Sequence, residues 1–356
     1  MDTVHIDLGE NSYDVMLDEG LIERAGREII TLTGAGKAVI LTETAVEKLY
    51  GQDLKRRLEE EGAEVLMMNL SPGENIRNLS VVKRVYEALA EFGIGEKDVL
   101  IALGGRAVGD ITGFAAATFQ SGIPYVQVPT SLLAQIGSSI GGKVSVDLGN
   151  RKNMIGVFYQ PRAVYIDTAA VRTLPPRYIH NGFGEAIKVG CVADKELFEI
   201  FEEASSDKEI IKRLPELIRR CVEIKAPVIE MDPRGKGERR ILDFGHLIGR
   251  AAERYYRFND QKITHGEATA AGMYMITKAS EMFGLTKQGT AQRIAYVLKS
   301  VGLPAGLDIP PDALSSLIEE NDRFGKGNEI PLILEIGKGY LYSGNTDMLK
   351  KYLYMK

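Results

Sequence analysis

The sequence contains few of the residues on which disulfide scaffolds and imidazole-rich sites depend. Its 356 residues include no tryptophan, and its only cysteines and histidines are Cys191, Cys221, His5, His180, His246 and His265. Two cysteines are too few for a disulfide framework or for a zinc module built on thiolates. Four histidines leave few candidates for any chemistry that needs an imidazole.

Long apolar runs and an excess of positive charge are also missing. No run approaches the roughly 18 to 20 residues of a membrane-spanning helix, and the first residues lack the basic and then apolar pattern of a signal peptide. The formal net charge is −5, which argues against a general nucleic-acid binder. With 44% hydrophobic residues the chain is too apolar to be disordered. We expect a soluble cytoplasmic protein that binds neither nucleic acid nor membrane, and its length predicts two domains.

The hydrophobic pattern differs between the two halves of the chain. In the first half, apolar strands are predicted at 37–42, 64–70, 98–103, 123–128 and 163–166, with helices at 46–61 and 81–92. Continuous apolar strands separated by amphipathic helices indicate a parallel sheet covered on both faces. Beyond Leu174-Pro175-Pro176 the periodicity is almost entirely helical. We therefore expect an N-terminal Rossmann-like α/β domain over 1–173 and an all-α C-terminal domain over 174–356.

The first half of the chain contains two glycine-rich segments. The turn Gly104–Asp110 joins a predicted strand to an apolar helix, where backbone and helix N-terminus can approach a phosphate. A tight turn also uses glycine, and the segment does not match G-x-G-x-x-G. Ser138–Lys143 resembles a phosphate-cradling loop without the P-loop spacing, and 151–153 adds cationic and amide donors.

One carboxylate and two imidazoles form a candidate divalent-metal set. Glu185 stands three residues before Lys188 in a helical pattern, so both project from one face. His246 follows a glycine, and His265 stands at a predicted helix start. Such a set leaves coordination positions open for substrate oxygen or water. Spacing alone does not establish the site.

Taken together, these motifs resemble the 3-dehydroquinate synthase family within the wider sugar-phosphate cyclases. The resemblance covers most of the chain. The matching segments, in chain order, are Pro72–Glu74, Gly104–Asp110, Pro129–Gln135, Ser138–Lys143, Lys152–Gly156, Leu174–Arg177, Gly184–Lys188, Phe244–His246 and His265–Ala268.

The resemblance implies a fold of this family's type, a homodimer and a set of site residues. It implies Zn2+ or Co2+ on Glu185, His246 and His265. It implies an NAD pocket formed by Glu74, Arg77, Gly104, Gly105, Arg106, Gly109, Asp110, Thr130, Ser131, Lys143, Lys152, Ala170 and Thr173. It implies catalytic and substrate-binding roles for Lys188, Lys225, Arg239, Arg250, Lys143 and Asn153.

The implied activity is that of a carbon–oxygen lyase of the shikimate pathway, which leads to the aromatic amino acids. The family converts 3-deoxy-D-arabino-heptulosonate 7-phosphate (DAHP) to 3-dehydroquinate and phosphate by NAD-mediated transient oxidation, elimination, re-reduction and aldol closure. Lys225 and Arg239 match the family's carboxylate-binding pair. That match points to a phosphorylated sugar acid rather than a neutral sugar phosphate.

Several matched positions depart from the family pattern. Arg106 replaces a glycine, Gly137 an aspartate, Ser121 an arginine that reaches the partner's substrate, Asp243 an asparagine and Arg250 a histidine. The run Asp322-Arg323-Phe324 replaces Asp-Lys-Lys. An anion at 243 is unfavourable beside a phosphate unless Arg250 compensates.

These departures leave several functions open. They fit compensated drift in an active synthase, a divergent cyclase with a different substrate, or a catalytically impaired homologue. A metal-dependent alcohol or glycerol dehydrogenase of the same fold is a more distant alternative. The segments Ser138–Lys143 and 152–156 argue against that alternative.

Overall fold

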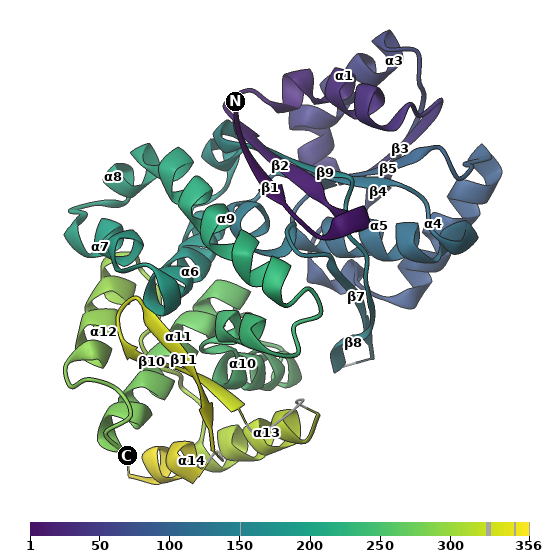
Figure 1. Ribbon diagram of the computed structural model, residues 1–356. Helices are drawn as coiled ribbons and strands as arrows, with labels where there is room; N and C mark the ends of the chain where they lie inside the picture. Colours follow the sequence, from purple (N-terminus) through teal and green to yellow (C-terminus); the bar gives the residue numbers. More distant parts are fainter. Residues whose placement is uncertain (150, 325–328, 345–346, 356) are drawn as a thin grey trace. The chain divides into compact units, whose positions relative to one another are not determined.

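The computed structural model describes residues 1–149, 151–324, 329–344 and 347–355, without the side chains of 75, 321–324 and 348. It separates into two compact units, Met1–Pro175 and Pro176–Lys356 (Figure 1). Within these ranges no helix combines the length and apolar character needed to cross a bilayer.

The N-terminal unit is built on a seven-stranded sheet with the order β1-β2-β9-β6-β5-β3-β4. Neighbouring strands run parallel, except that β1 pairs with β2 in the antiparallel sense. The strands are β1 (Asp2–Ile6), β2 (Tyr13–Asp18), β3 (Lys37–Glu43), β4 (Glu64–Leu70), β5 (Val99–Gly104), β6 (Tyr125–Pro129) and β9 (Ala163–Asp167). The predicted parallel α/β domain is confirmed, and β1 and β2 are additions that the apolar pattern did not reveal.

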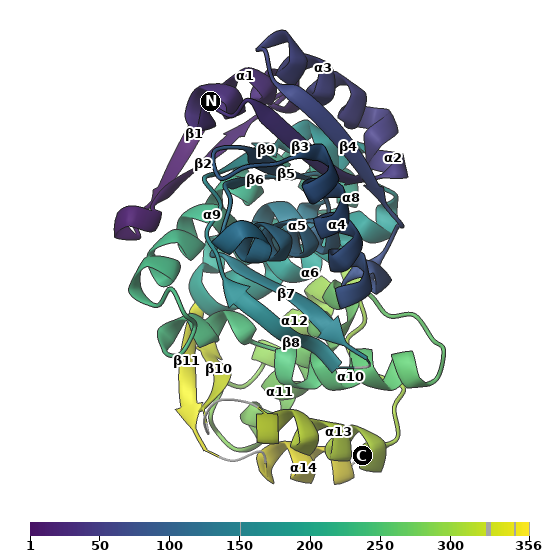
Figure 2. The ribbon, with the colours of Figure 1, turned by 90° about the vertical axis from the view of Figure 1, so that its right-hand side faces the viewer.

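Helices cover both faces of this sheet. The helices are α1 (Ile22–Thr33), α2 (Thr44–Val46), α3 (Gln52–Glu60), α4 (Leu79–Phe92) and α5 (Arg106–Thr118). Figure 2 shows α1 and α3 on one face and α4 and α5 on the other, and two separate apolar cores correspond to these faces. In α4, Val82, Val85 and Leu89 recur at helical spacing and form its buried side. The predicted two-sided covering of the sheet is therefore present.

A two-stranded hairpin follows the second glycine-rich segment. It consists of β7 (Lys143–Leu148) and β8 (Arg151–Phe158), paired in the antiparallel sense. Val144 and Val146 belong to the apolar core that also contains α4 and α5. A Cβ at Gly113 would lie 2.5 Å from the side chain of Val144, so a glycine lets α5 approach the hairpin. The segment predicted as a phosphate loop thus leads directly into a strand.

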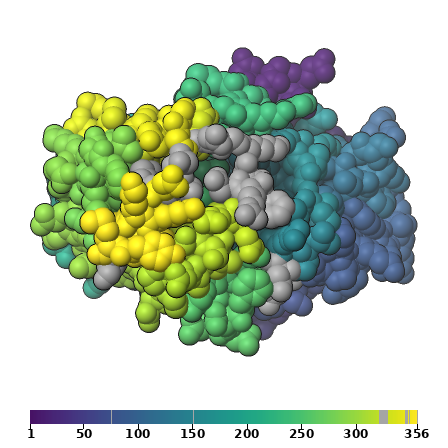
Figure 3. Space-filling view, turned by 90° about the horizontal axis from the view of Figure 1, so that it is seen from below, coloured from purple at the N-terminus to yellow at the C-terminus, as the bar shows by residue number. Residues whose placement is uncertain are grey.

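The C-terminal unit is mainly helical. Its helices are α6 (Pro176–Ala193), α7 (Lys195–Glu203), α8 (Asp207–Lys212), α9 (Leu214–Met231), α10 (His246–Phe258), α11 (His265–Met282), α12 (Thr290–Ser300), α13 (Pro311–Phe324) and α14 (Asp347–Tyr354). A 3-10 turn at Glu238–Asp243 precedes α10. Figure 3 shows the yellow C-terminal segment beside the yellow-green segment that contains α13, and the Tyr354 hydroxyl donates to Asp312 at 2.8 Å.

The prediction of an all-α unit is wrong in one detail. A hairpin of β10 (Glu329–Glu335) and β11 (Lys338–Ser343) lies in this unit. Leu332 and Ile333 of β10 are buried, and Gly337 makes the tight turn at a φ of +83°. The Gly337 N–H donates to the carbonyl of Cys191 at 2.8 Å, and Thr286 Oγ1 donates to the carbonyl of Ile333 at 2.6 Å. The strands form because the helices offer them apolar contact and hydrogen-bond partners, which a local pattern does not reveal.

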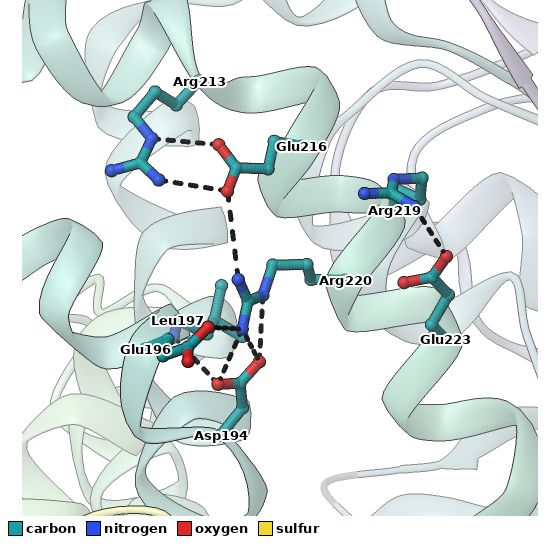
Figure 4. Close-up of polar contacts among 8 residues, drawn as sticks. All are labelled: Asp194, Glu196, Leu197, Arg213, Glu216, Arg219, Arg220 and Glu223. Atoms are coloured by element: carbon teal, nitrogen blue, oxygen red, sulfur yellow. Dashed lines mark hydrogen bonds and ion pairs between the residues drawn. The ribbon is translucent and has the colours of Figure 1, made fainter.

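An arginine anchors α9 to the junction between α6 and α7 (Figure 4). The Arg220 guanidinium donates to both carboxylate oxygens of Asp194 at 2.7–3.0 Å and to Glu196 at 2.9 Å. Asp194 also caps α7 by accepting from the Leu197 N–H at 3.1 Å. Arg220 and Asp194 are partly buried, with 24% and 16% of their side chains exposed. Arg220 therefore ties α9 to the end of α6 and to the start of α7.

We expect Arg220→Ala to lower the free energy of unfolding by about 1–3 kcal/mol, because it removes charge-assisted hydrogen bonds from a partly buried carboxylate. Arg219→Ala is the matched control on the same helix. Its partner Glu223 is about as exposed as Arg219 itself, so the change should stay within about 0.5 kcal/mol. Urea denaturation followed by circular dichroism measures both, and equal losses in the two variants would contradict the anchoring role.

Candidate functional site

The carboxyl ends of β3 and β5 form one candidate binding edge in the N-terminal unit. These strands are neighbours in the sheet, yet the helices that follow them cover opposite faces. In open α/β sheets ligands bind where the direction of winding reverses in this way. Glu43 ends β3, and the turn Gly104–Gly105 stands between β5 and α5. The sheet topology therefore places the first glycine-rich turn where a dinucleotide would be expected.

Close packing is a second reason why glycines occupy this turn. A Cβ at Gly104 would lie 2.8 Å from the side chain of Val108, and one at Gly109 would lie 2.8 Å from that of Gln127. A side chain at Gly109 would push α5 away from β6. A Cβ at Gly105 would meet its nearest neighbour, Ser131 Oγ, at 3.4 Å, so the backbone is less crowded there. The N-terminus of α5 begins at Arg106, where its free N–H groups favour an anion.

A fully buried arginine organises the polar residues near this turn. Arg77 pairs with Glu74 at 3.1 Å and with Asp110 at 3.0 Å, and Asp147 lies 3.7 Å away. It also donates to Ser145 at 3.2 Å and to Asn153. Arg77 therefore connects the segment before α4 with α5 and with the hairpin β7–β8.

The pKa values of two acidic partners of Arg77 are shifted in opposite directions. Burial raises the pKa of Asp110 to about 6, although the charges of Arg77 and Arg106 lower it. For Glu74, burial also acts to raise the pKa, but Arg106, Arg77 and Lys152 outweigh it and hold the pKa below its usual value. Glu74 is thus a stable anion beside three cations. Four of the residues predicted for the cofactor pocket (Glu74, Arg77, Arg106 and Asp110) form one ionic cluster.

Glu43 is a candidate that the sequence analysis missed. It accepts from the Gly73 N–H at 3.4 Å, and burial together with the charge of Glu74 raises its pKa. An acidic residue at a strand end near such a glycine turn is a usual acceptor for ribose hydroxyls of a dinucleotide. The signal was a carboxylate immediately after the predicted strand 37–42.

The other residues predicted for the cofactor pocket also lie in the N-terminal unit. Thr130 follows β6, and its N–H donates to the carbonyl of Gly104 at 3.0 Å. Ala170 and Thr173 lie in the turn after β9, where the Thr173 hydroxyl contacts that of Tyr50 at 2.9 Å. Lys143 begins β7, and Lys152 and Asn153 lie on β8. Asn153 has a φ of +55°, and its N–H donates to Asp147 at 2.9 Å.

In the C-terminal unit the structure brings the three predicted metal ligands together. Glu185 on α6, His246 at the start of α10 and His265 at the start of α11 place one potential ligand atom each within 4.8 Å of the others. Among the described residues, the His246 Nε2 atom is buried and has no hydrogen-bond partner. A buried nitrogen without a partner is what a missing metal ion would explain. One carboxylate and two imidazoles suit Zn2+ or Co2+, so the site fits the metal.

Close backbone packing between helices creates this cluster. A Cβ at Gly184 would lie 2.7 Å from the carbonyl oxygen of Gly266, joining α6 to α11. A Cβ at Gly272 would lie 2.1 Å from the carbonyl oxygen of Gly245, joining α11 to the start of α10. Each predicted ligand is the chain neighbour of one of these glycines. The Gly266 N–H also donates to Asn181 Oδ1 at 2.6 Å.

Two cations surround the carboxylate of this cluster. Lys188 Nζ donates to Glu185 at 2.8 Å, and both side chains are buried. Burial acts to raise the pKa of Glu185, but Lys188, Lys225 and His246 lower it to about 2. Burial and the charge of Lys188 lower the pKa of His246 to about 3. The cluster therefore holds an ionised carboxylate and a neutral imidazole at neutral pH, which are the forms that bind a metal.

Lys225 and Arg239 are both buried near this cluster. Lys225 lies on α9, and burial lowers its pKa to about 7, assisted by the charges of Lys188 and Arg239. Arg239 Nη1 donates to the carbonyl of Pro233 at 3.0 Å. Buried cations of this kind attract an anion from solution, because an anionic partner offsets their desolvation.

The departures from the family pattern lie in several places. Arg106 folds along α5 towards Asp110, with Nε at 3.7 Å from the carboxylate. Gly137 lies in the turn 134–138, and Ser121 is exposed in the turn after α5 with a φ of +67°. Asp243 lies 3.6 Å from Arg250. The side chains of Asp322, Arg323 and Phe324 lie outside the described residues.

The two remaining histidines contact carboxylates away from the metal cluster. His5 on β1 lies 2.7 Å from Asp14 on β2, and both side chains are exposed, whereas His180 lies 2.7 Å from Asp207. Neither belongs to the three-residue cluster. The expectation that they are surface or packing residues agrees with these positions.

Comparisons with known proteins agree on one family. The model of the 3-dehydroquinate synthase N-terminal domain matches residues 67–181, and that of the 3-dehydroquinate synthase C-terminal domain matches 182–323. The 3-dehydroquinate synthase of Clostridium acetobutylicum is 42% identical over 99% of both chains. That of Streptococcus sanguinis is 35% identical over 98% of this chain and 99% of its own.

Solved structures share the fold. A 2-epi-5-epi-valiolone synthase from Streptomyces hygroscopicus, with NAD+ and Zn2+ bound, superposes with a TM-score of 0.88 at 25% identity, over 98% of this chain and 97% of its own. A 2-deoxy-scyllo-inosose synthase gives 0.87 at 24% identity over 99% of both chains. A probable glycerol dehydrogenase from Sinorhizobium meliloti gives only 0.67 at 15% identity, over 96% of this chain and 95% of its own. With both family models matched and 42% identity along almost its whole length, this chain belongs to the 3-dehydroquinate synthase family.

Proposed function

We propose that this protein is a metal- and NAD-dependent 3-dehydroquinate synthase, which converts DAHP to 3-dehydroquinate and phosphate in the shikimate pathway. The observation that carries the proposal is the buried set of Glu185, His246 and His265 with Lys188, Lys225 and Arg239 around it, in a chain 42% identical to a named synthase. The reaction makes it a carbon–oxygen lyase.

In this proposal the N-terminal domain, 1–173, holds NAD at the carboxyl ends of β3, β5 and β6. When bound, NAD supplies a hydride acceptor and donor. The amides at the start of α5 favour its pyrophosphate, and Glu43 and Glu74 offer acceptors for ribose hydroxyls. We assign Arg77, Gly104, Gly105, Arg106, Gly109, Asp110, Thr130, Ser131, Lys143, Lys152, Ala170 and Thr173 to the same pocket.

The C-terminal domain, 174–356, holds the divalent metal and the substrate. Glu185, His246 and His265 hold Zn2+ or Co2+, and the metal when bound polarises a substrate hydroxyl. Lys188 keeps Glu185 ionised through its contact at 2.8 Å. Lys225 and Arg239 bind the substrate carboxylate, since both are buried cations and a carboxylate offsets the cost of their burial.

Lys143, Asn153 and Arg250 complete the proposed substrate contacts. Lys143 and Arg250 are cations that favour a phosphate. The Asn153 side-chain oxygen accepts from Ser145 at 3.0 Å as well as from Arg77, so its orientation is set. We further propose a cytoplasmic homodimer, and the two free and buried cysteines are compatible with a reducing compartment.

The decisive experiment incubates the purified protein with DAHP, NAD and Zn2+ or Co2+ and follows phosphate release. We expect phosphate and 3-dehydroquinate in equal amounts, with NAD acting catalytically because it is reduced and reoxidised within one turnover. Omission of NAD or treatment with a chelator should abolish the release. Measurable NAD binding without phosphate release would contradict the proposal and favour a different sugar phosphate or an inactive homologue.

Metal stoichiometry tests the ligand set. We expect about one equivalent of zinc in the wild-type protein and near-complete loss in His265→Ala and Glu185→Ala, because three ligands are the minimum for such a site. His180→Ala is the matched control, since His180 also pairs with a carboxylate but lies outside the cluster. Elemental analysis measures all four proteins. Equal zinc in His265→Ala and wild type would reject the assignment.

The pH dependence of kcat/KM tests Lys225. Its pKa of about 7 means that the free enzyme carries this cation below pH 7 and loses it as the pH rises. We expect kcat/KM for DAHP to fall above about pH 7, by up to tenfold per pH unit, because kcat/KM reports ionisations of the free enzyme. Lys225→Arg keeps the charge at all accessible pH values, so its profile should lack that limb. An unchanged limb in the variant would assign it to another group.

A further inference from the structure

We propose that Asp243 and Glu253 are the outer carboxylates that orient the two imidazoles of the metal set, and that Arg250 balances the charge of Asp243. The inference rests on the proposed metal site and deepens it. It assigns a positioning role to two acidic residues for which the sequence provided none, and it gives one physical reason for two of the departures from the family pattern.

The two imidazoles have the same outer contact. His246 Nδ1 lies 3.0 Å from Asp243 Oδ1, and His265 Nδ1 lies 3.0 Å from Glu253 Oε1. An ionised carboxylate can only accept a hydrogen bond, so each Nδ1 must be the donor. The lone pair of each ring then resides on Nε2, the tautomer that binds a metal through Nε2.

The free ring nitrogen of His246 supports this tautomer independently. Its Nε2 atom is buried and lacks a hydrogen-bond partner in the described structure, while its Nδ1 is bonded to Asp243. The same histidine contributes to the cluster whose ligand atoms lie within 4.8 Å. The two rings are 5.1 Å apart between centroids and tilted by 56°, so both reach one point without stacking.

Helix α10 and the turn before it supply all three positioning groups. Asp243 ends the 3-10 turn, three residues before His246, and Glu253 lies two turns into α10, where it reaches across to His265 on α11. Glu253 has only 6% of its side chain exposed, whereas 36% of that of Asp243 is exposed. The rigid helix therefore sets the orientation of both rings, one in its own chain segment and one on its neighbour.

Arg250 offsets the negative charge of Asp243. Its Nη2 lies 3.6 Å from the same Asp243 oxygen that His246 contacts. An aspartate and an arginine together carry no net charge, as an asparagine and a neutral histidine would. The two departures thus preserve the local net charge while giving His246 an anionic acceptor, which strengthens the hydrogen bond.

The test measures metal affinity in the full-length protein, stripped with a chelator and titrated with Zn2+ against a chromophoric competitor. We expect Asp243→Ala and Glu253→Gln to raise the Kd for Zn2+ about 10–100-fold, the usual effect of losing such a partner. In Co2+-loaded protein the visible absorption bands should shift, because the ring orientation changes. Asp207→Asn is the matched control, since Asp207 also contacts a histidine ring nitrogen, Nε2 of His180 at 2.7 Å, outside the cluster.

A double substitution tests the role of Arg250. Arg250→His and Asp243→Asn should each raise the Kd, and the two substitutions combined should raise it less than the product of these single effects. Additive effects would reject the charge balance. Unchanged Kd and Co2+ spectra in Asp243→Ala and Glu253→Gln would overturn the positioning role.

Two outcomes separate this inference from the proposed function. If the wild-type protein itself binds no Zn2+, the metal set fails; if it binds while the carboxylate variants bind equally well, only the positioning role fails. Should buried Glu253→Gln not fold, the more exposed Asp243→Ala still decides the question through its Co2+ spectrum.

Discussion

The metal cluster depends on direct contact between the backbones of α6, α10 and α11. At Gly184, Gly245 and Gly266 a Cβ atom would lie between 2.1 and 2.8 Å from atoms of a neighbouring element, which no real side chain tolerates. Each of these glycines adjoins one of the three predicted ligands. The ligands converge because the helices touch at the residues next to them. An alanine at any of the three positions would separate the helices and with them the ligand atoms.

The C-terminal unit also buries several charged side chains around the metal cluster. Glu185, Lys188, Lys225 and Arg239 are all buried, which would be unfavourable for isolated groups. The pair Glu185–Lys188 offsets part of that cost within the protein. Lys225, whose pKa is lowered by burial, is stabilised further when an anion binds. The site is therefore arranged to gain from an acidic ligand.

The N-terminal unit also buries paired charges, and here they surround an arginine. Arg77 is completely buried and interacts with Glu74, Asp110 and Asp147. Arg106 joins this ionic cluster through Asp110 rather than lying apart from it. Its side chain extends along α5, so a bulky residue at a glycine position is accommodated by an existing acidic partner. The replacement at 106 and the exchange at 243 and 250 each have a charged partner in the structure.

Much of the fold was predictable from local pattern. The strand 64–70 has the predicted bounds, and the other four predicted strands differ from β3, β5, β6 and β9 by at most two residues at either end. These strands are continuous apolar runs because both faces of the sheet are covered. The hairpins β7–β8 and β10–β11 were not predicted, since several of their residues are exposed and their pairing depends on contacts with distant helices.

The sequence by itself determined the family, the parallel sheet and the identity of the candidate ligands, because short motifs around glycines, histidines and acidic residues carry that information. Only the tertiary structure decided that Glu185, His246 and His265 meet, and that Asp243 and Glu253 contact the two rings. The reason is physical. These residues come from three helices and from the turn before α10, and no local periodicity records how closely two helix backbones approach each other.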